Sequence, residues 1–398
     1  MHASRILRQC LSTVLAPMHA ARSRRLLDAV EALVTGRRLT LTDLARSWPG
    51  AIWMHAPLKA LDRLLSNRLL HQSVLPFQQA MANWLLPQGA RPYVLVDWAD
   101  LKGDGRWAVL RASIPVGGRA LTLYEQIFPL KRMGQPKAQL EFLQQLRRVV
   151  PKQHVPIIVT DAGFRSDWLR GVQALGWDYI GRLRNNTQVR SLRDQDWHAC
   201  ASLHPAATAR AIDLGRYQIV KGNPLACRLV LTKRTRKGRE QLTRQQQPQQ
   251  GRTAKKARKA AHEPWLLVTS LTGRTATAPQ IVAGYAKRMQ IEEAFRDLKS
   301  HRYGAAFEDS LSRKSERLTV LLLLQTLASF AAWLMGLAAR EAEVPDPMTR
   351  QPKHHHRYSL LRRGLAWLRR ITLPPELCLQ LIRKSLATLC AQNAGVGL

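Results

Sequence analysis

The chain has 398 residues, enough for a large buried core and for two or three domains. Its 62 Lys and Arg residues against 27 Asp and Glu give a formal net charge of +35, and the basic residues recur from end to end. Such a charge attracts polyanions. Ribosomal proteins and membrane-surface proteins carry similar charge, but they rarely combine it with 45% hydrophobic content over this length. The composition therefore favours a globular enzyme that acts on DNA.

The five cysteines are scattered and include no Cys-x-x-Cys pair. We expect reduced core thiols, not zinc ligands or disulfides, as in a cytosolic protein. The N-terminal stretch has Arg5 and Arg8 but no apolar segment long enough for a signal peptide, so export is not expected.

Residues 1–88 are predicted to form a helical DNA-binding region. Apolar residues recur at helical spacing over 26–34, and Gly36 supplies a stop. The segment 40–46 opens with capping residues and is similar to the first helix of a helix-turn-helix; the run 57–70 suits a helix that faces DNA. That run carries basic residues, among them Lys59 and Arg63. A plain helical bundle would explain the leucines equally well.

Residues 91–184 are predicted to form the first part of an α/β core. Three strand-like runs with turn residues between them predict an antiparallel meander: 93–98, 107–116 and 121–128. A helix, a buried strand, a second helix and a further strand are then expected: 136–151, 157–161, 168–172 and 179–183. The order βββαβαβ is that of the ribonuclease-H-like fold.

Two apolar runs in this part end in a carboxylate, at Asp97 and at Asp161. An Asp inside an apolar run is costly to bury unless it is paired or binds a metal, although a strand-end turn residue is the ordinary alternative. The Ala162-Gly163 pair after Asp161 lets the backbone turn sharply and leaves that carboxylate open. Both residues are therefore candidate metal ligands.

The stretch 285–300 is predicted to form a single amphipathic helix. At about 100° per residue, four polar residues share one face: Tyr285, Arg288, Glu292 and Lys299. Apolar residues occupy the neighbouring face, and Glu293 and Asp297 are expected on the far side. Two cations beside Glu292 would keep its carboxylate ionised for metal binding. A surface helix with incidental ion pairs is the alternative.

The spacing Tyr-x2-Arg-x3-Glu-x6-Lys resembles the YREK motif of the insertion-sequence-four family of bacterial cut-and-paste transposases. The resemblance spans about residues 24–340, and the blocks VDW, LRAS, LYE, DAGF and RMQIEE are similar to those of its transposon-ten branch. It implies a ribonuclease-H-like catalytic core in which Glu292 completes an Asp-Asp-Glu triad with Asp97 and Asp161. The triad would hold two Mg²⁺ ions, with Mn²⁺ as a substitute.

The resemblance also implies the binding partners and the location of the enzyme. Its partner would be double-stranded DNA, both transposon ends and target, bound by a homodimer in a synaptic complex in the bacterial cytoplasm, with no membrane. Around the triad, DNA contacts are implied for Tyr285, Arg288 and Lys299, and Met289 would wedge into a distorted base step or else be a core residue. A metal-dependent nuclease of the same fold and a catalytically dead DNA-binding copy remain alternatives.

Three further regions complete the expected organisation. Residues 185–275 would form a β-rich insertion containing a mobile basic loop, 233–262, with 11 Lys or Arg and one acid. Residues 276–340 would close the catalytic core. They contain an uninterrupted run of 22 uncharged residues, 318–339, which is long enough to span a bilayer. We expect this run to form a buried core helix. Residues 341–398 would form a basic helical region.

Overall fold

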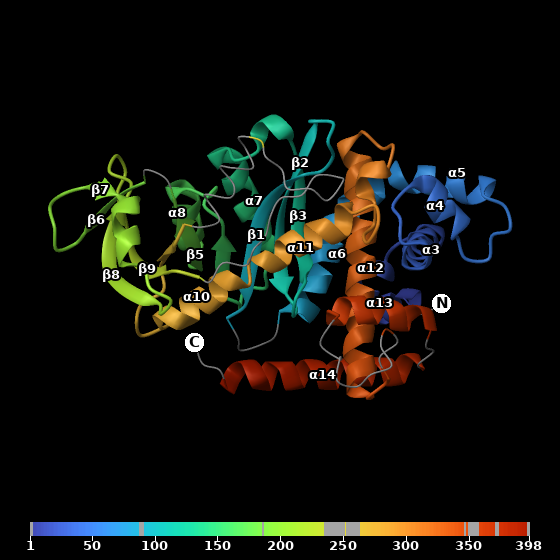
Figure 1. Ribbon diagram of the computed structural model, residues 1–398. Helices are drawn as coiled ribbons and strands as arrows, with labels where there is room; N and C mark the ends of the chain where they lie inside the picture. Colours follow the sequence, from blue (N-terminus) through green and yellow to red (C-terminus); the bar gives the residue numbers. More distant parts are fainter. Residues whose placement is uncertain are drawn as a thin grey trace. The chain divides into compact units, whose positions relative to one another are not determined.

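The computed structural model describes residues 3–86, 91–184, 187–234, 251, 263–345, 348, 358–370 and 374–395 (Figure 1). The chain divides into two compact units: Met1–Pro156 with Arg288–Gly397 is unit 1, and Ile157–Lys287 is unit 2. This division differs from the predicted domain boundaries, which stay a prediction. The predicted loop 233–262 lies outside the described residues, apart from Lys233, Arg234 and Gly251.

Unit 1 begins with a run of helices: α1 (Ala3–Cys10), α2 (Ser12–Leu15), α3 (Ala20–Gly36), α4 (Leu41–Arg46), α5 (His55–Leu65) and α6 (Arg68–Leu85). Thr40 caps α4 as predicted, because its Oγ1 accepts a hydrogen bond from the Asp43 amide at 3.1 Å. Helices α3, α4 and α5 pack against one another. The residues between α4 and α5, 47–54, form a longer connection than the turn of a typical helix-turn-helix.

One predicted feature of these helices is wrong, and another is confirmed. The run 57–70 is not one helix, because Asn67 starts α6 by accepting a hydrogen bond from the Leu70 amide at 2.9 Å. Gly36 ends α3 as predicted, and Arg37 after it adopts the left-handed conformation, with φ of 66°. A Cβ on Gly36 would lie 2.3 Å from Ser47 Oγ, so this glycine provides close packing.

The meander of unit 1 is confirmed. Strands β1 (Tyr93–Asp100), β2 (Trp107–Pro115) and β3 (Ala120–Pro129) pair antiparallel in chain order. They are followed by η1 (Leu130–Arg132) and by α7 (Pro136–Val149), which has its proline in the first turn and ends close to the predicted position.

Helix α12 (Ser315–Glu341) forms the centre of unit 1. It contacts β3 and the helices α1, α3, α5, α6, α13 (Leu360–Arg370) and α14 (Pro375–Gly395), and Figure 1 shows the two red helices crossing it. Among the described residues, α12 is the one helix long and apolar enough to cross a membrane, and 89% of its apolar window is buried inside the chain. The prediction of a buried core helix over 318–339 is therefore confirmed.

Unit 2 contains the remaining strands in the order β4-β5-β10-β9-β8-β6-β7. Their bounds are β4 (Ile157–Thr160), β5 (Asp178–Leu183), β6 (Gln188–Ser191), β7 (His198–Ala199), β8 (Ile212–Ile219), β9 (Leu225–Thr232) and β10 (Trp265–Thr269). Strands β4 and β5 are parallel and are joined by α8 (Ser166–Ala174), whereas β10 pairs antiparallel with both β5 and β9. The predicted βββαβαβ order is thus observed along the chain, and the insertion is rich in strands as expected. Segment η2 (Cys200–Ala206) and helix α10 (Ala278–Ala286) complete this unit.

The cysteine prediction is confirmed as far as the described side chains reach. Four cysteines are free and buried: Cys10, Cys200, Cys227 and Cys378. Burial raises the pKa of each thiol, to about 12 for Cys10 and Cys227. They are therefore unreactive core residues.

Candidate active site

Asp97 lies on β1, in a cross-strand row with Arg111 of β2 and Glu125 of β3. Residues paired in this way project from the same face of a sheet. The Asp97 side chain is 15% exposed, and its Oδ1 accepts a hydrogen bond from the Trp98 amide at 2.9 Å. Helix α11 (Met289–Lys299) lies across β1, β2 and β3 (Figure 1). Strand β1 therefore presents the Asp97 carboxylate on the face of the sheet that α11 covers.

The other two members of the row form a buried ion pair. Arg111 donates to Glu125 Oε2 from Nε at 2.8 Å and from Nη2 at 2.7 Å, and the two side chains are 3% and 5% exposed. Thr326 of α12 donates to Glu125 Oε1 at 3.0 Å, and the Arg111 guanidinium lies 4.7 Å from the centre of the Phe295 ring of α11. The buried pair therefore supports α11 through the contact between Arg111 and the Phe295 ring.

Sequence reasoning assigned no role to this pair, although Arg111 and Glu125 belong to the LRAS and LYE blocks. The signal that could have found them is the register of the meander. Buried charges within strand runs are costly unless they meet, and antiparallel pairing brings them opposite each other beside Asp97.

The predicted single helix over 285–300 is wrong. Helix α10 ends at Ala286, residues 287–288 form a turn, and α11 starts at Met289. The Lys287 amide bonds to the Gly284 carbonyl and the Ile291 amide to the Arg288 carbonyl, three residues back in both cases. Both turn residues keep right-handed helical angles. Tyr285 thus belongs to unit 2, while the rest of the YREK motif belongs to unit 1.

Helix α11 lies against β1, β2 and β3 through the apolar face that the sequence predicted. Its buried residues are Ile291, Phe295 and Leu298. The expectation that Glu293 and Asp297 point to the far side is wrong, because both pair with Arg119 at the β2–β3 hairpin, with closest N–O distances of 3.9 and 2.5 Å. A cation on the hairpin therefore fixes the helix along the sheet.

Arg288 connects the strand carboxylate to the helix carboxylate. Its Nη1 donates to Asp97 Oδ2 at 3.1 Å, and its Nη2 donates to Glu292 Oε1. The Arg288 and Glu292 side chains are 14% and 41% exposed. Two of the three predicted acids thus share one guanidinium, in a position that solvent reaches from the Glu292 side.

Asp161 follows β4 in unit 2 and is half-buried. The Gly163 amide donates to Asp161 Oδ1 at 2.8 Å, and a Cβ on Gly163 would lie 3.1 Å from that oxygen. The glycine therefore permits a turn that folds back onto the carboxylate. The preceding Thr160 Oγ1 is buried without a hydrogen-bond partner among the described residues.

Tyr285 is buried, 4% exposed, and its ring meets Trp265 of β10 edge to face at a centroid distance of 4.8 Å. This packing fixes the orientation of α10 on the strands of unit 2. The predicted contact between Tyr285 and a phosphate stays a prediction.

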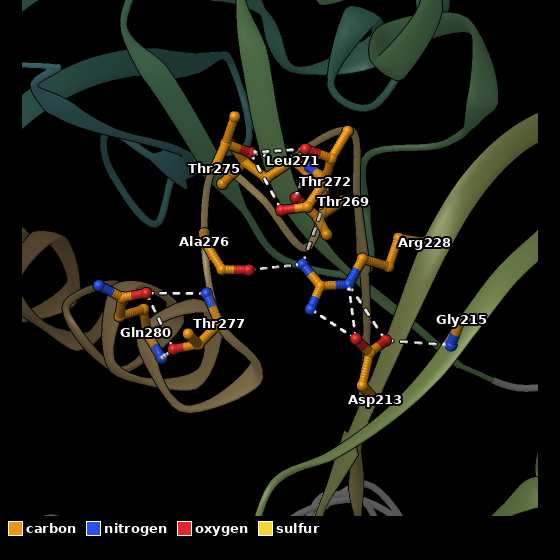
Figure 2. A network of polar contacts seen from close by, with 10 residues as sticks. All are labelled: Asp213, Gly215, Arg228, Thr269, Leu271, Thr272, Thr275, Ala276, Thr277 and Gln280. Carbon is orange, nitrogen blue, oxygen red and sulfur yellow. Dashed lines mark hydrogen bonds and ion pairs between the residues drawn. The ribbon is translucent and has the colours of Figure 1, made fainter. Parts of the chain in front are cut away.

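Arg228 of β9 holds the start of α10 in place (Figure 2). Its guanidinium binds both oxygens of Asp213 on β8, and its Nη1 also donates to the carbonyl oxygens of Leu271 at 3.4 Å and Ala276 at 2.6 Å. The adjoining Thr277 and Gln280 form a capping box at the N-terminus of α10. The hydrogen bonds from Arg228 lower the pKa of the Asp213 carboxyl below its usual range. Sequence reasoning missed this network.

The remaining predicted DNA-binding residues are dispersed over unit 1. Met289 begins α11 beside Arg288, whose Nη2 approaches its sulfur at 3.9 Å. Lys299 stands in the last turn of α11, half-buried, and has no ion pair among the described residues. Lys59 and Arg63 are exposed on α5, one helical turn apart. Their roles stay predictions.

The residues 89–331 match the family model described as the transposase DDE domain, which covers more than half of the chain. The chain belongs to the DDE transposase family. The matched segment of this transposase contains Asp97, Asp161 and Glu292. No curated protein matches its sequence.

The donor chemistry of the site fits a divalent cation. DDE transposase domains generally use divalent metals, and carboxylate oxygens are the ligands that Mg²⁺ and Mn²⁺ prefer. In unit 1 a positive guanidinium already lies between two such carboxylates. Across the described part of the chain, however, no group of three or more His, Cys, Asp or Glu residues is placed to hold a metal ion.

Proposed function

We propose that this DDE transposase belongs to the insertion-sequence-four family, in its transposon-ten branch, and moves its element by cutting and joining DNA. The observation that carries the proposal is the shared guanidinium: Arg288 of the YREK motif binds Asp97 and Glu292 together. A strand and a helix that are far apart in the sequence thereby bring two acids of the motif to one cation. An incidental surface ion pair would not need a buried strand residue.

Asp97, Asp161 and Glu292 are proposed as the catalytic acids of a ribonuclease-H-like core that holds two divalent ions, magnesium or manganese. When bound, two such ions activate the attacking oxygen and stabilise the leaving oxygen of a phosphoryl transfer. The half-exposed Glu292 gives access for the ions and the DNA from the solvent side.

Arg288 is proposed to serve in two states of the site. Without metal its guanidinium neutralises the Asp97 and Glu292 carboxylates, which would otherwise repel each other. With the carboxylates holding divalent ions, the Arg288 guanidinium would instead pair with a phosphate oxygen of the DNA, for which it is well suited. One residue thus prepares the site and then binds the substrate.

The proposed reaction sequence uses one site four times. Water first nicks the transposon end, the released 3′-hydroxyl attacks the opposite strand to form a hairpin, and water reopens it. The same hydroxyl finally joins the target DNA. Because each step is a phosphoryl transfer with a different nucleophile, the same acids serve in all of them.

DNA binding is proposed to extend beyond the acids. Lys299 would pair with a terminal phosphate, Met289 would enter a distorted base step, and Tyr285 would position a phosphate by hydrogen bonding. The exposed Lys59 and Arg63 on α5 would contact the terminal inverted repeat. We also propose a homodimer in the synaptic complex, because both ends are cut together, and a bacterial cytoplasmic, nucleoid-associated location without a membrane.

The test is cleavage of linear DNA that carries the end of the parent element, in magnesium, by the intact protein and by Glu292→Gln. We expect hairpinned and joined products from the intact protein and a loss of at least about 1,000-fold in the variant, with end binding retained. Glu293→Gln is the matched control, because it removes the same charge one residue along and leaves the Asp97–Arg288–Glu292 cluster unchanged.

Other outcomes would point elsewhere. Nicking by the intact protein without hairpins or joining would indicate a metal-dependent nuclease of the same fold. Binding without chemistry in either protein would indicate a catalytically dead DNA-binding copy. Equal activity of Glu292→Gln and the intact protein would remove Glu292 from the site.

A further inference from the structure

The connection between α4 and α5 carries three consecutive exposed apolar residues. The exposed fractions are 88% for Ile52, 80% for Trp53 and 38% for Met54. In Figure 1 this blue segment projects away from the helices that it joins. A run of exposed large apolar side chains has an unfavourable hydration free energy and is unusual in a folded protein unless it contacts a partner. We call Ile52, Trp53 and Met54 the apolar tip.

The charges around the apolar tip indicate the chemistry of the partner. Asp62 is paired with Arg317 at 2.8 Å, and Asp43 lies 3.6 Å from Arg46, so both nearby acids are compensated. By contrast, Lys59 and Arg63 are exposed and have no ion pair among the described residues. The tip therefore stands beside a net positive surface on α5, which complements a polyanion.

The position of the apolar tip relative to α5 indicates how such a partner would be met. The tip directly precedes His55, the first residue of α5. A helix that enters a DNA groove brings its N-terminal end to the base edges, while the cations along it reach phosphates. Apolar side chains at that end are then placed to enter between base pairs, and an indole ring stacks on bases of any sequence.

We propose that the apolar tip is a DNA wedge, in which Trp53 with Ile52 inserts into a base step of duplex DNA while Lys59 and Arg63 hold the flanking phosphates. This rests on the proposed function only in that the partner is DNA. The wedge is separate from the Asp-Asp-Glu site and needs no metal. It distorts one step of the duplex, which gives the N-terminal helices a preference for deformable steps.

The experiment is permanganate probing of thymines in a duplex from the DNA that flanks the coding sequence, with the full-length protein and EDTA present. Permanganate oxidises unstacked thymines, so every thymine in the duplex reports on a wedge. We expect a thymine to become hyperreactive at a fixed position with the intact protein and not with Trp53→Ala. Trp53→Phe, which keeps a ring, should retain part of the signal.

Affinity measurements separate stacking from charge. Trp53→Ala should weaken duplex binding about tenfold without changing the salt dependence, because it removes stacking and no phosphate contact. Lys59→Ala and Arg63→Ala should each reduce the slope of log affinity against log salt by about one. The control is Leu69→Ala, which truncates another exposed apolar residue of unit 1, 53% exposed, on α6.

Each outcome bears on one proposal. DNA binding with equal thymine reactivity and affinity in Trp53→Ala and Leu69→Ala would overturn the wedge and leave the proposed transposase activity untouched. A change in sedimentation of Trp53→Ala without DNA, at unchanged DNA affinity, would show that the tip contacts a second copy and would also overturn it. A failure of the intact protein to bind any duplex would overturn the wedge and the proposed function together, and circular dichroism checks that each variant is folded.

Discussion

Two arginines, one in each unit, bind carboxylates in different ways. Arg228 in unit 2 uses its donors on both oxygens of a single Asp213 and on two backbone carbonyls. Arg288 in unit 1 divides its donors between Asp97 and Glu292, which come from a strand and a helix. Arg228 therefore binds one carboxylate and does not connect two. Arg288 leaves two carboxylates that another cation could bridge, so Arg228 is suited to hold structure and Arg288 to exchange partners.

Arg111 forms a third arginine–carboxylate pair, with Glu125, and this pair is more deeply buried than those of Arg228 and Arg288. We therefore expect the largest effect on stability there. Glu125→Gln leaves the Arg111 charge buried and uncompensated, and should lower the free energy of unfolding by about 3–5 kcal/mol. The measurement is chemical denaturation, with Glu141→Gln as the control. Glu141 forms a half-exposed pair with Arg132, so its loss should cost less than about 1 kcal/mol. Equal losses would show that the row beside Asp97 is not supported by its ion pair.

Arg288→Met tests whether that arginine acts by exchange. End cleavage should fall about 100-fold because a phosphate contact is lost. Calorimetric titration of the DNA-free protein with Mn²⁺ should show tighter binding, because no guanidinium competes for the Asp97 and Glu292 carboxylates. Weaker Mn²⁺ binding would mean that Arg288 only orients these acids, and the contrast with Arg228 would then be lost.

Asp213→Asn tests the structural arginine. The variant leaves the largely buried Arg228 without its anionic partner and should cost about 2 kcal/mol of local stability. Hydrogen exchange of the β8 and β9 amides measures this loss within unit 2. The pKa of Asp213 is lower in the folded state than in the unfolded state, where it is about 4. The contribution of the Asp213 carboxylate to stability is therefore complete above the unfolded pKa and disappears as the pH falls through the folded pKa. The two proteins should therefore differ at pH 7 and converge in acid; a difference independent of pH would exclude this ionic explanation.

Lys299→Ala should have the smallest effect. Because this half-buried lysine has no ion pair in the described part of the chain, its removal should leave stability unchanged. It should weaken end binding several-fold at low salt and reduce the salt slope by about one. Arg296→Ala, which removes a cation already paired with Glu293 at 2.9 Å, is the matched control. An unchanged salt slope in Lys299→Ala would remove this residue from the DNA surface.

Local patterns were enough to predict most elements of the fold. The alternation and turn residues of the meander, the proline that opens α7 and the uncharged run of α12 each specify a structure within one segment. The same local reasoning failed at residues 287–288, where hydrogen bonds three residues back interrupt the expected helix.

The sequence by itself determined which residues are candidates for chemistry, because the motif spacing and the ends of apolar runs single out Asp97, Asp161 and Glu292. Only the tertiary structure decided that Arg288 joins two of these acids, that Arg111 and Glu125 support the helix above them, and that Arg228 anchors α10. Each of these contacts joins residues far apart in the chain. Their distances depend on strand register and helix docking, which no local periodicity records.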